Sequence, residues 1–143
     1  MHDFLEKLDD EGLSLLIIKD GKTLFSSNRD GMAPLLEAID NLGLSKLSDS
    51  IVVDKMVGKA AALLVCFFKA KEVHTRIMSL RAKEVLDKFA IKYCSEKAVP
   101  EILNKSGTDI CPFERAVLDL DDPEEGYKRL ASEVKRLAAS RKN

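Results

Sequence analysis

Apolar and polar residues alternate in two different rhythms along this chain. Near the N-terminus, the run LSLLIIKDGKTLFSSN places Asp20-Gly21 between two apolar stretches. Both residues tolerate the positive φ angles of a tight hairpin turn. We therefore predict antiparallel strands over 13–19 and 23–26. The segment MHDFLEKLDD before them has the spacing of a short amphipathic helix.

A four-residue rhythm follows in the middle of the chain. The segment GMAPLLEAIDNLG predicts a helix that begins near Pro34 and ends at Gly43. After the short β-branched run SIVV, apolar pairs recur every four residues, which predicts a helix over about 55–69. This helix is apolar around most of its circumference, so we expect it to be largely buried.

The second half of the chain continues to alternate between strand and helix patterns. EVHTRIM predicts a strand, SLRAKEVLDKFA a helix with Ser79 as N-cap, and IKYCS another strand. We then predict a short or kinked helix over about 96–104, which carries Pro100, and a loop at KSGTDI. CPFERAVLDL starts a helix with Pro112 in its first turn, and DPEE starts a last helix over about 123–140.

A hairpin followed by alternating helices and strands predicts an α/β fold. The later strands should be parallel and joined by right-handed helical crossovers, with helices on both faces of a mixed sheet. The expected architecture is therefore a three-layer α-β-α sandwich. The length of 143 residues fits one domain over 1–143.

Composition and charge exclude several classes of function. Hydrophobic residues make up 45% of the chain and the formal net charge is −1, which argues against a nucleic-acid binder. The one basic cluster, VKRLAASRKN, suits the end of a helix. The chain has no apolar run of about 20 residues that would span a membrane and no secretory signal. Three cysteines then predict free thiols in the cytoplasm.

The segment DKMVGKAAALL carries a Gly-Lys pair where a helix is predicted to begin. A phosphate-binding P-loop needs an earlier glycine and a hydroxyl residue after the lysine, and both are missing here. A helix N-terminus still attracts anions through its unpaired N–H groups, and Lys55, Gly58 and Lys59 would border such a site. The alternative is that Asp54 only caps the helix and that the lysines are solvated.

The chain does not have the ligand pattern of a zinc site. Its histidines and cysteines occur in no C-x-x-C or H-x-x-x-H pairing, and a catalytic zinc needs about three protein ligands at compatible spacing. We therefore expect no metal and no other cofactor. The residues concerned are His2, His74, Cys66, Cys94 and Cys111.

The densest polar signal is NKSGTDICPFERA. With Cys111 as N-cap and Glu114 at the third helical position, the segment resembles a capping box with sulfur in place of a hydroxyl. The same geometry favours a thiolate, so Cys111 is a candidate nucleophile or redox thiol; the alternative is a structural cap or a ligand-lining residue. Polar loops before helices collect binding residues, here Asn104, Gly107 and Thr108.

The segments DKMVGKAAALL, VHTRIMSLRAKEVL and NKSGTDICPFERAV, in this order, resemble the prokaryotic domain-of-unknown-function family numbered eighteen ninety-three. The resemblance covers nearly the whole chain and implies a cytidine-deaminase-like fold without an established activity. Zinc deaminases place H-x-E or C-x-E at one helix start and P-C-x-x-C at the next. The corresponding starts here, at Gly58-Lys59-Ala60 and after Ser79, offer no such ligands. Zinc-dependent deamination is therefore not expected.

Three functions remain open from the sequence. The first is a domain that binds a nucleotide or another small phosphorylated ligand. The second is a metal-free enzyme that uses Cys111. The third is an interaction protein or homo-oligomer that associates through the apolar stripe of the last helix. The predicted ligand-binding residues are Asp54, Lys55, Gly58, Lys59, Ser79, Asn104, Gly107, Thr108, Cys111 and Glu114.

Overall fold

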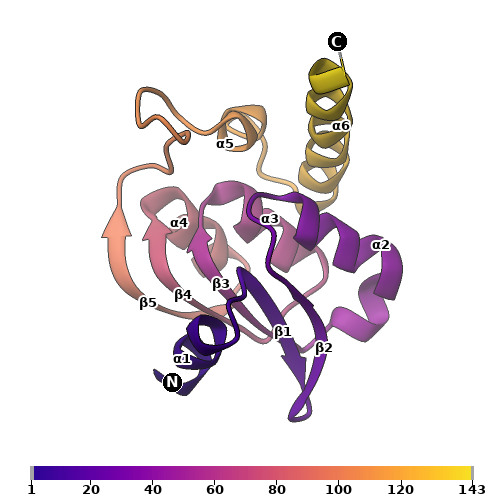
Figure 1. Ribbon diagram of the computed structural model, residues 1–143, viewed down its shortest axis with the longest axis vertical. Coiled ribbons are helices and arrows are strands. Elements are labelled where there is room, and N and C mark those ends of the chain that lie inside the picture. The colour runs from indigo at the N-terminus through magenta and orange to yellow at the C-terminus, as the bar shows by residue number, and fades with distance from the viewer. Residues whose placement is uncertain (1, 143) are drawn as a thin grey trace.

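The computed structural model describes residues 2–142, which form five strands and six helices joined by loops (Figure 1). The strands form one mixed sheet in the order β2-β1-β3-β4-β5. Strand β1 runs antiparallel to β2 and β3, whereas β3, β4 and β5 are parallel. The elements are α1 (His2–Asp10), β1 (Leu15–Lys19), β2 (Lys22–Ser27), α2 (Ala33–Leu47), β3 (Ile51–Val57), α3 (Lys59–Phe67), β4 (Glu72–Ser79), α4 (Leu80–Lys88), β5 (Lys92–Val99), α5 (Pro112–Ala116) and α6 (Pro123–Lys142).

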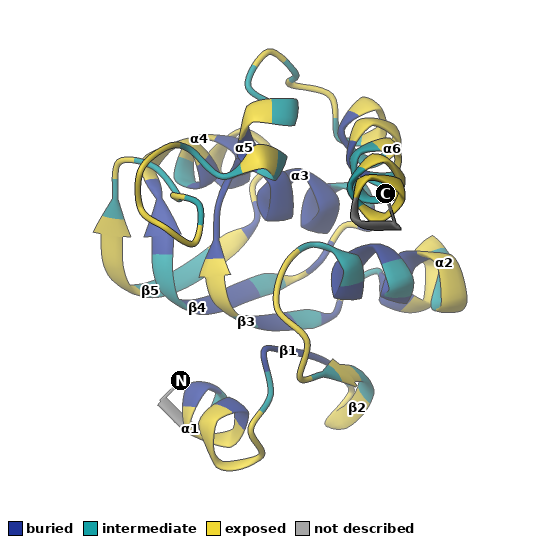
Figure 2. Cartoon of the chain, turned by 45° about the horizontal axis from the view of Figure 1, so that its top comes forward, coloured by how far each residue is buried: buried dark blue, intermediate teal, exposed yellow. Residues whose placement is uncertain are grey.

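The two faces of the sheet are covered unequally. On one face, α1 packs against Leu16, Ile18 and Val53 through Leu5 and Leu8. The other face carries the main core, which is built around α3, with α2, α4 and α6 beside it (Figures 1 and 2). The predicted mixed α/β sheet that begins with an antiparallel hairpin is therefore confirmed. Asp20 and Gly21 have φ angles of 51° and 76° in that hairpin turn, as the Asp-Gly pair predicted.

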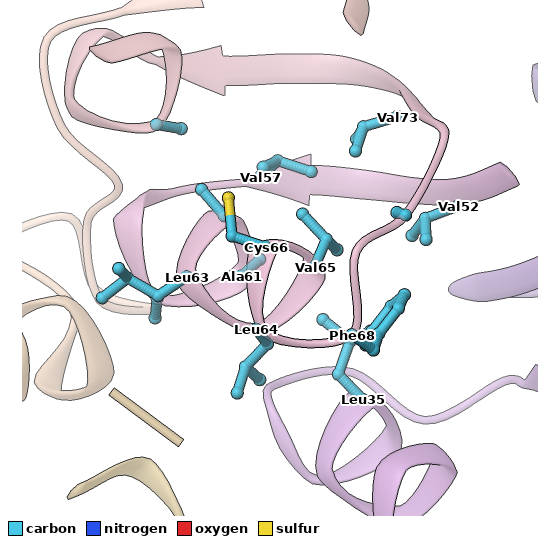
Figure 3. Packing of buried hydrophobic residues seen from close by; sticks show 14 of the residues in the cluster. Leu35, Val52, Val57, Ala61, Leu63, Leu64, Val65, Cys66, Phe68 and Val73 are labelled. Carbon is cyan, nitrogen blue, oxygen red and sulfur yellow. The ribbon is translucent and has the colours of Figure 1, made fainter. Parts of the chain in front are cut away.

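Helix α3 is the centre of the main core (Figure 3). Every residue from Lys59 to Cys66 is buried. Leu64 and Val65 are at most 1% exposed, and the same cluster includes Leu35 from α2 and Val73 from β4. Full burial of one such aliphatic side chain stabilises a fold by about 1.5–3 kcal/mol. The prediction of a largely buried helix is confirmed.

One predicted helix start and one predicted helix are wrong, because strand pairing overrides the local pattern. The helix predicted over 55–69 begins only at Lys59, since residues up to Val57 continue the parallel ladder with β4. The helix predicted over 96–104 is absent, because β5 runs to Val99 and pairs with β4 as far as Ser79. Buried backbone N–H and C=O groups need hydrogen-bond partners. Strand β4 provides these partners to both segments, and the local helical pattern does not reveal this.

Two further boundaries differ in detail. Gly43 has φ 83° and interrupts the helix as predicted, but helical structure resumes and α2 ends at Leu47. The last helix begins at Pro123, as the DPEE signal predicted, and extends to Lys142. Within the described residues, no helix has both the length and the apolar character needed to span a membrane.

Candidate functional site

The predicted anion site at the start of α3 is filled by a carboxylate of the chain itself. Glu114 in α5 accepts two hydrogen bonds there, from Lys59 N at 2.8 Å and from Ala60 N at 2.7 Å. These N–H groups belong to the first turn of the helix, where no intrahelical partner exists. A negative charge is also favourable at the positive end of the helix dipole. An external anion would have to displace Glu114.

Gly58 makes this contact sterically feasible. It is the N-cap of α3, and a Cβ atom built on it would lie 2.2 Å from Glu114 Oε1. Its φ of −106° is open to any residue, so the requirement for glycine comes from the close approach and not from the backbone conformation. Gly58 from the segment DKMVGKAAALL and Glu114 from the segment NKSGTDICPFERA therefore form one contact.

Lys59 does not reach toward solvent. The residue is 6% exposed, and its Nζ donates a hydrogen bond to the carbonyl oxygen of Leu118 at 3.0 Å. The Nζ also lies 3.7 Å from Asp121 Oδ1. The lysine therefore ties the start of α3 to the connection between α5 and α6.

Burial dominates the electrostatics of Glu114. The residue is 4% exposed, and loss of solvation raises the pKa of its carboxyl above the ordinary value. The N–H groups of Ala60 and Lys59 and the charge of Lys59 oppose this rise. The charged carboxylate is thus tolerated here because it has specific donors.

Asp54 lies in β3 and does not cap α3, so the interpretation of Asp54 as a helix cap is wrong. Burial raises the pKa of its carboxyl, hydrogen bonds from the Met56 and Lys55 backbone lower it, and the nearby charge of Asp30 raises it. Together these effects give a pKa of about 7. A carboxyl that titrates near neutral pH can hold or release a proton under working conditions. Lys55 itself is exposed.

Ser79 acts as the predicted N-cap of α4. Its Oγ accepts a hydrogen bond from Ala82 N at 3.1 Å, and the residue is fully buried. This hydroxyl therefore has a structural role within its own helix.

The polar loop before α5 is held by its own hydrogen bonds. Asn104 Oδ1 accepts from Thr108 N at 3.1 Å and from the Ser106 hydroxyl at 3.2 Å. Gly107 has φ 71° and donates its N–H to the carbonyl of Asn104 at 3.0 Å. The loop is thus a compact turn that lies, with α5, beyond the carboxyl ends of the parallel strands (Figure 1).

Cys111 is the N-cap of α5, as predicted, but it makes no side-chain capping hydrogen bond. The capping-box interpretation is wrong, because Glu114 reaches across to α3 and not back to the start of its own helix. The thiol is half-buried and free.

A groove of about 410 Å³ lies between this loop, α5 and α6. Arg115 Nη2 donates a hydrogen bond to Asp109 Oδ1 at 2.7 Å. Arg136 forms a bidentate pair with Glu133, from Nε to Oε1 at 2.9 Å and from Nη2 to Oε2 at 2.6 Å. Sequence analysis missed both arginines, because FERA was considered for its glutamate and VKRL as a helix end. The lining residues are Asn104, Asp109, Ile110, Pro112, Arg115, Ala116, Glu133 and Arg136.

The predicted site residues therefore divide into separate groups. Gly58, Lys59 and Glu114 meet in one internal contact, whereas Ser79 caps a different helix. Asn104 borders the groove. In the described part of the chain, no three histidine, cysteine, aspartate or glutamate side chains are arranged to hold a metal ion.

Comparison with known proteins identifies a family and a solved structure that this chain resembles. The family model named Domain of unknown function (DUF1893) matches residues 3–134. The crystal structure of a DUF1893 family protein (TM1506) from Thermotoga maritima has a TM-score of 0.81 and 32% identity, covering 92% of this chain and 88% of that chain. No curated protein matches. This chain belongs to the DUF1893 family.

Proposed function

We propose that this protein is a small-molecule-binding domain with a cytidine-deaminase-like fold that has no zinc centre. The ligand would be a nucleotide or another phosphorylated small molecule, bound in the groove between the loop at 104–110, α5 and α6. The observation that carries the proposal is the presence of two guanidinium groups, on Arg115 and Arg136, in one groove of about 410 Å³.

The two arginines of the groove suit a phosphate group, although each is paired with a carboxylate, Asp109 or Glu133. Arginine presents a planar set of N–H donors that matches phosphate in a bidentate way. The side chains of Arg115 and Arg136 are 56% and 63% exposed, so their present ion pairs are weak. A phosphate could therefore take over these donors at small cost, while Asp109 and Glu133 would become acceptors for ligand hydroxyl or amino groups.

The position of the groove in the fold also supports binding. In open α/β sheets, ligands bind outside the carboxyl ends of the strands, and the loop and α5 lie at that end of β3, β4 and β5 (Figure 1). Of the two predicted ligand-binding segments, the start of α3 is closed by Glu114. The segment at 104–114 is therefore the better candidate.

The deaminase-like scaffold is supported by the sheet order β2-β1-β3-β4-β5 and by family membership. The helix starts that carry zinc ligands in deaminases hold Gly58-Lys59-Ala60 and the residues after Ser79 in this chain. The three free cysteines favour a reducing compartment such as the cytoplasm.

A thermal-shift screen of nucleotides and nucleotide sugars tests the proposal. A ligand at 100 times its dissociation constant stabilises the folded state by about 2.7 kcal/mol. Arg136→Ala and Arg115→Ala should each reduce that shift. The matched control is Lys135→Ala, which removes an exposed charge from α6 outside the groove. A shift that both arginine variants retain in full, or no shift with any phosphorylated compound, would contradict this binding site.

The interaction-protein alternative has less support. Of the four residues in the predicted stripe of α6, Leu130 is fully buried and Tyr127 and Val134 pack against the main core, whereas Leu137 is half-buried and lies outside that core. Most of the stripe therefore already has a partner within the chain. Light scattering would report a homo-oligomer directly.

A further inference from the structure

Strand β5 leaves one edge of the sheet open. It is the last strand in the order β2-β1-β3-β4-β5, so it pairs with β4 on one side only. In the described part of the chain, no helix or loop lies along its outer side (Figures 1 and 2). The outward-facing N–H and C=O groups of such a strand are available to another strand. The outer edge of β5 is therefore a candidate surface for binding an extended segment.

The two edge strands of the sheet differ in how well they are protected. Bulges, prolines, short length or a covering segment normally keep edge strands from pairing. The ladder between β2 and β1 shifts register between Ile17 and Ile18, and such a bulge distorts that edge. Strand β5 is eight residues long, contains no proline and keeps one constant register with β4. Of the two edges, that of β5 is therefore better suited to a partner.

The charges on β5 restrict which strand can pair with it. Lys92 and Glu96 are exposed and project from the same face of the sheet, because side chains alternate along a strand. Two copies of β5 can form an antiparallel pair around a two-fold axis at Cys94. In that register, Lys92 of each copy lies opposite Glu96 of the other, which is favourable. Moving the axis to a point between Cys94 and Ser95 would instead place Lys92 opposite Lys97, and like charges would meet.

Arg76 gives Glu96 a need for a second cation. Arg76 Nη1 donates to Glu96 Oε1 at 2.8 Å, and the same guanidinium is paired with Asp9 of α1. Within one chain, this arginine therefore serves two carboxylates. Lys92 of a second copy would supply the missing positive charge, so that two cations face two anions.

The same register also gives an exposed apolar side chain new neighbours. Phe89 lies in the turn between α4 and β5 and is 39% exposed. The antiparallel register brings the end of β5 from the second copy, with Ala98 and Val99, to this turn. Charge and apolar contacts thus favour one and the same arrangement.

We propose that two copies of this chain associate through β5, as an antiparallel pair with the two-fold axis at Cys94. The five strands of each copy then form one continuous sheet, and the interface is isologous, since each copy contributes the same surface. Neither the arginine groove nor the stripe of α6 takes part, because both are made of other residues. The proposal is thus independent of the proposed function.

The first test is light scattering over a range of protein concentrations. Lys92→Glu and Glu96→Lys each place like charges opposite one another twice in the symmetric pair. We expect each variant alone to lower the association constant by at least about tenfold. An equal mixture of the two variants should recover it, because both charge pairs in the mixed dimer are again of opposite sign.

The matched control is Lys97→Glu, which makes the same charge change at an exposed neighbour on the same strand. In the proposed register this residue lies opposite Ile91, so the variant should associate like the parent chain. Circular dichroism checks that each variant is folded. Recovery by mixing separates a charge effect from a folding defect, because a misfolded chain is not repaired by a second variant.

The second test is cross-linking with a short bismaleimide in a Cys111→Ser background. Cys66 is buried in α3, so Cys94 is the reactive thiol, and we expect it to link to Cys94 of the second copy. The register control moves the thiol, by Cys94→Ser with Ala98→Cys. The two residues at position 98 are eight residues apart along the pair, or about 26 Å, so they should not be linked.

Three results would overturn the proposal. The first is a parent chain that stays monomeric at the highest concentration tested. The second is association that Lys92→Glu leaves unchanged or that mixing with Glu96→Lys does not recover. The third is cross-linking at position 98 that is as efficient as at Cys94. If Glu96→Lys does not fold, Lys92→Glu and the cross-linking pair decide without it.

Discussion

Helices α3 and α4 begin at the carboxyl ends of the neighbouring parallel strands β3 and β4. Their first backbone N–H groups find hydrogen-bond acceptors in different ways. In α4, Ser79 caps its own helix through Ala82, three residues along the chain. In α3, the acceptor is Glu114, which is 55 and 54 residues from its two donors. A local cap stabilises one helix, whereas the remote cap also anchors α5 to the core.

The burial of α3 explains why its first N–H groups need an acceptor from elsewhere in the chain. Every residue in the first two turns of α3 is buried, so water cannot satisfy its N-terminal donors. Gly58 leaves the space that the carboxylate occupies, and Lys59 reaches to the connection before α6. The Gly-Lys pair thus resembles a phosphate-binding motif because it serves the same need, which is to bind an anion at a helix start. Here the anion belongs to the chain.

Replacing the remote cap should have the largest effect. Glu114→Ala leaves two buried donors unpaired, which we expect to lower the free energy of unfolding by about 2–4 kcal/mol. Glu114→Gln keeps one acceptor oxygen and should cost less. Guanidinium unfolding measures both, with Glu124→Ala as a control at an exposed helix start. A loss within about 0.5 kcal/mol, the range of ordinary surface changes, would show that water replaces the carboxylate.

Filling the space at Gly58 should come next. The added methyl group of Gly58→Ala would overlap the Glu114 carboxylate and lower the free energy of unfolding by about 1–3 kcal/mol. In a Glu114→Ala background the same substitution should cost far less, because the overlap is gone. A double-mutant cycle measures this coupling, and additive effects of the two changes would contradict the close contact.

The carboxyl of Asp54 should make stability depend on pH. Its folded pKa of about 7 lies above the ordinary 3.8, so the folded state keeps a proton that the unfolded state releases between these values. Its contribution is fully present below about pH 4 and is lost as pH rises through about 7. Asp54→Asn mimics the protonated form and should gain about 1–2 kcal/mol at pH 8 relative to pH 5.

Urea unfolding at the two pH values checks the Asp54 prediction, with Asp10→Asn as a control at an exposed carboxylate. The register partner of Asp54 on β4 is Thr75. Its side chain is neutral, so we expect this pH dependence from the strand before α3 and not from the strand before α4. The same difference between variant and parent at both pH values would mean that Asp54 is solvated like an ordinary aspartate.

Removing the local cap should have the smallest effect. Ser79→Ala leaves one donor of α4 without its acceptor and should cost about 1 kcal/mol. Ser79→Thr keeps a hydroxyl acceptor without placing a charge at this fully buried position, and should cost less. Chemical unfolding of the two variants separates the hydrogen bond from the loss of side-chain volume. A Ser79→Ala loss as large as that of Glu114→Ala would remove the distinction between local and remote caps.

The features that were predictable from the sequence depend on nearby residues. The hairpin follows from Asp20-Gly21, the start of α4 from Ser79, and the burial of α3 from its apolar circumference. The errors occur where strand pairing extends past its local signal, as at the start of α3 and along β5. No local pattern indicates how long a neighbouring strand will offer hydrogen-bond partners.

The candidate sites divide in the same way. The sequence by itself determined the N-terminal hairpin, the burial of α3 and the cap of α4, because each depends on residue types at short spacing. Only the tertiary structure decided that Glu114 caps α3 and that Arg115 and Arg136 share a groove. These contacts join residues far apart in the chain, and they form only when the sheet register and the helix packing bring those residues together.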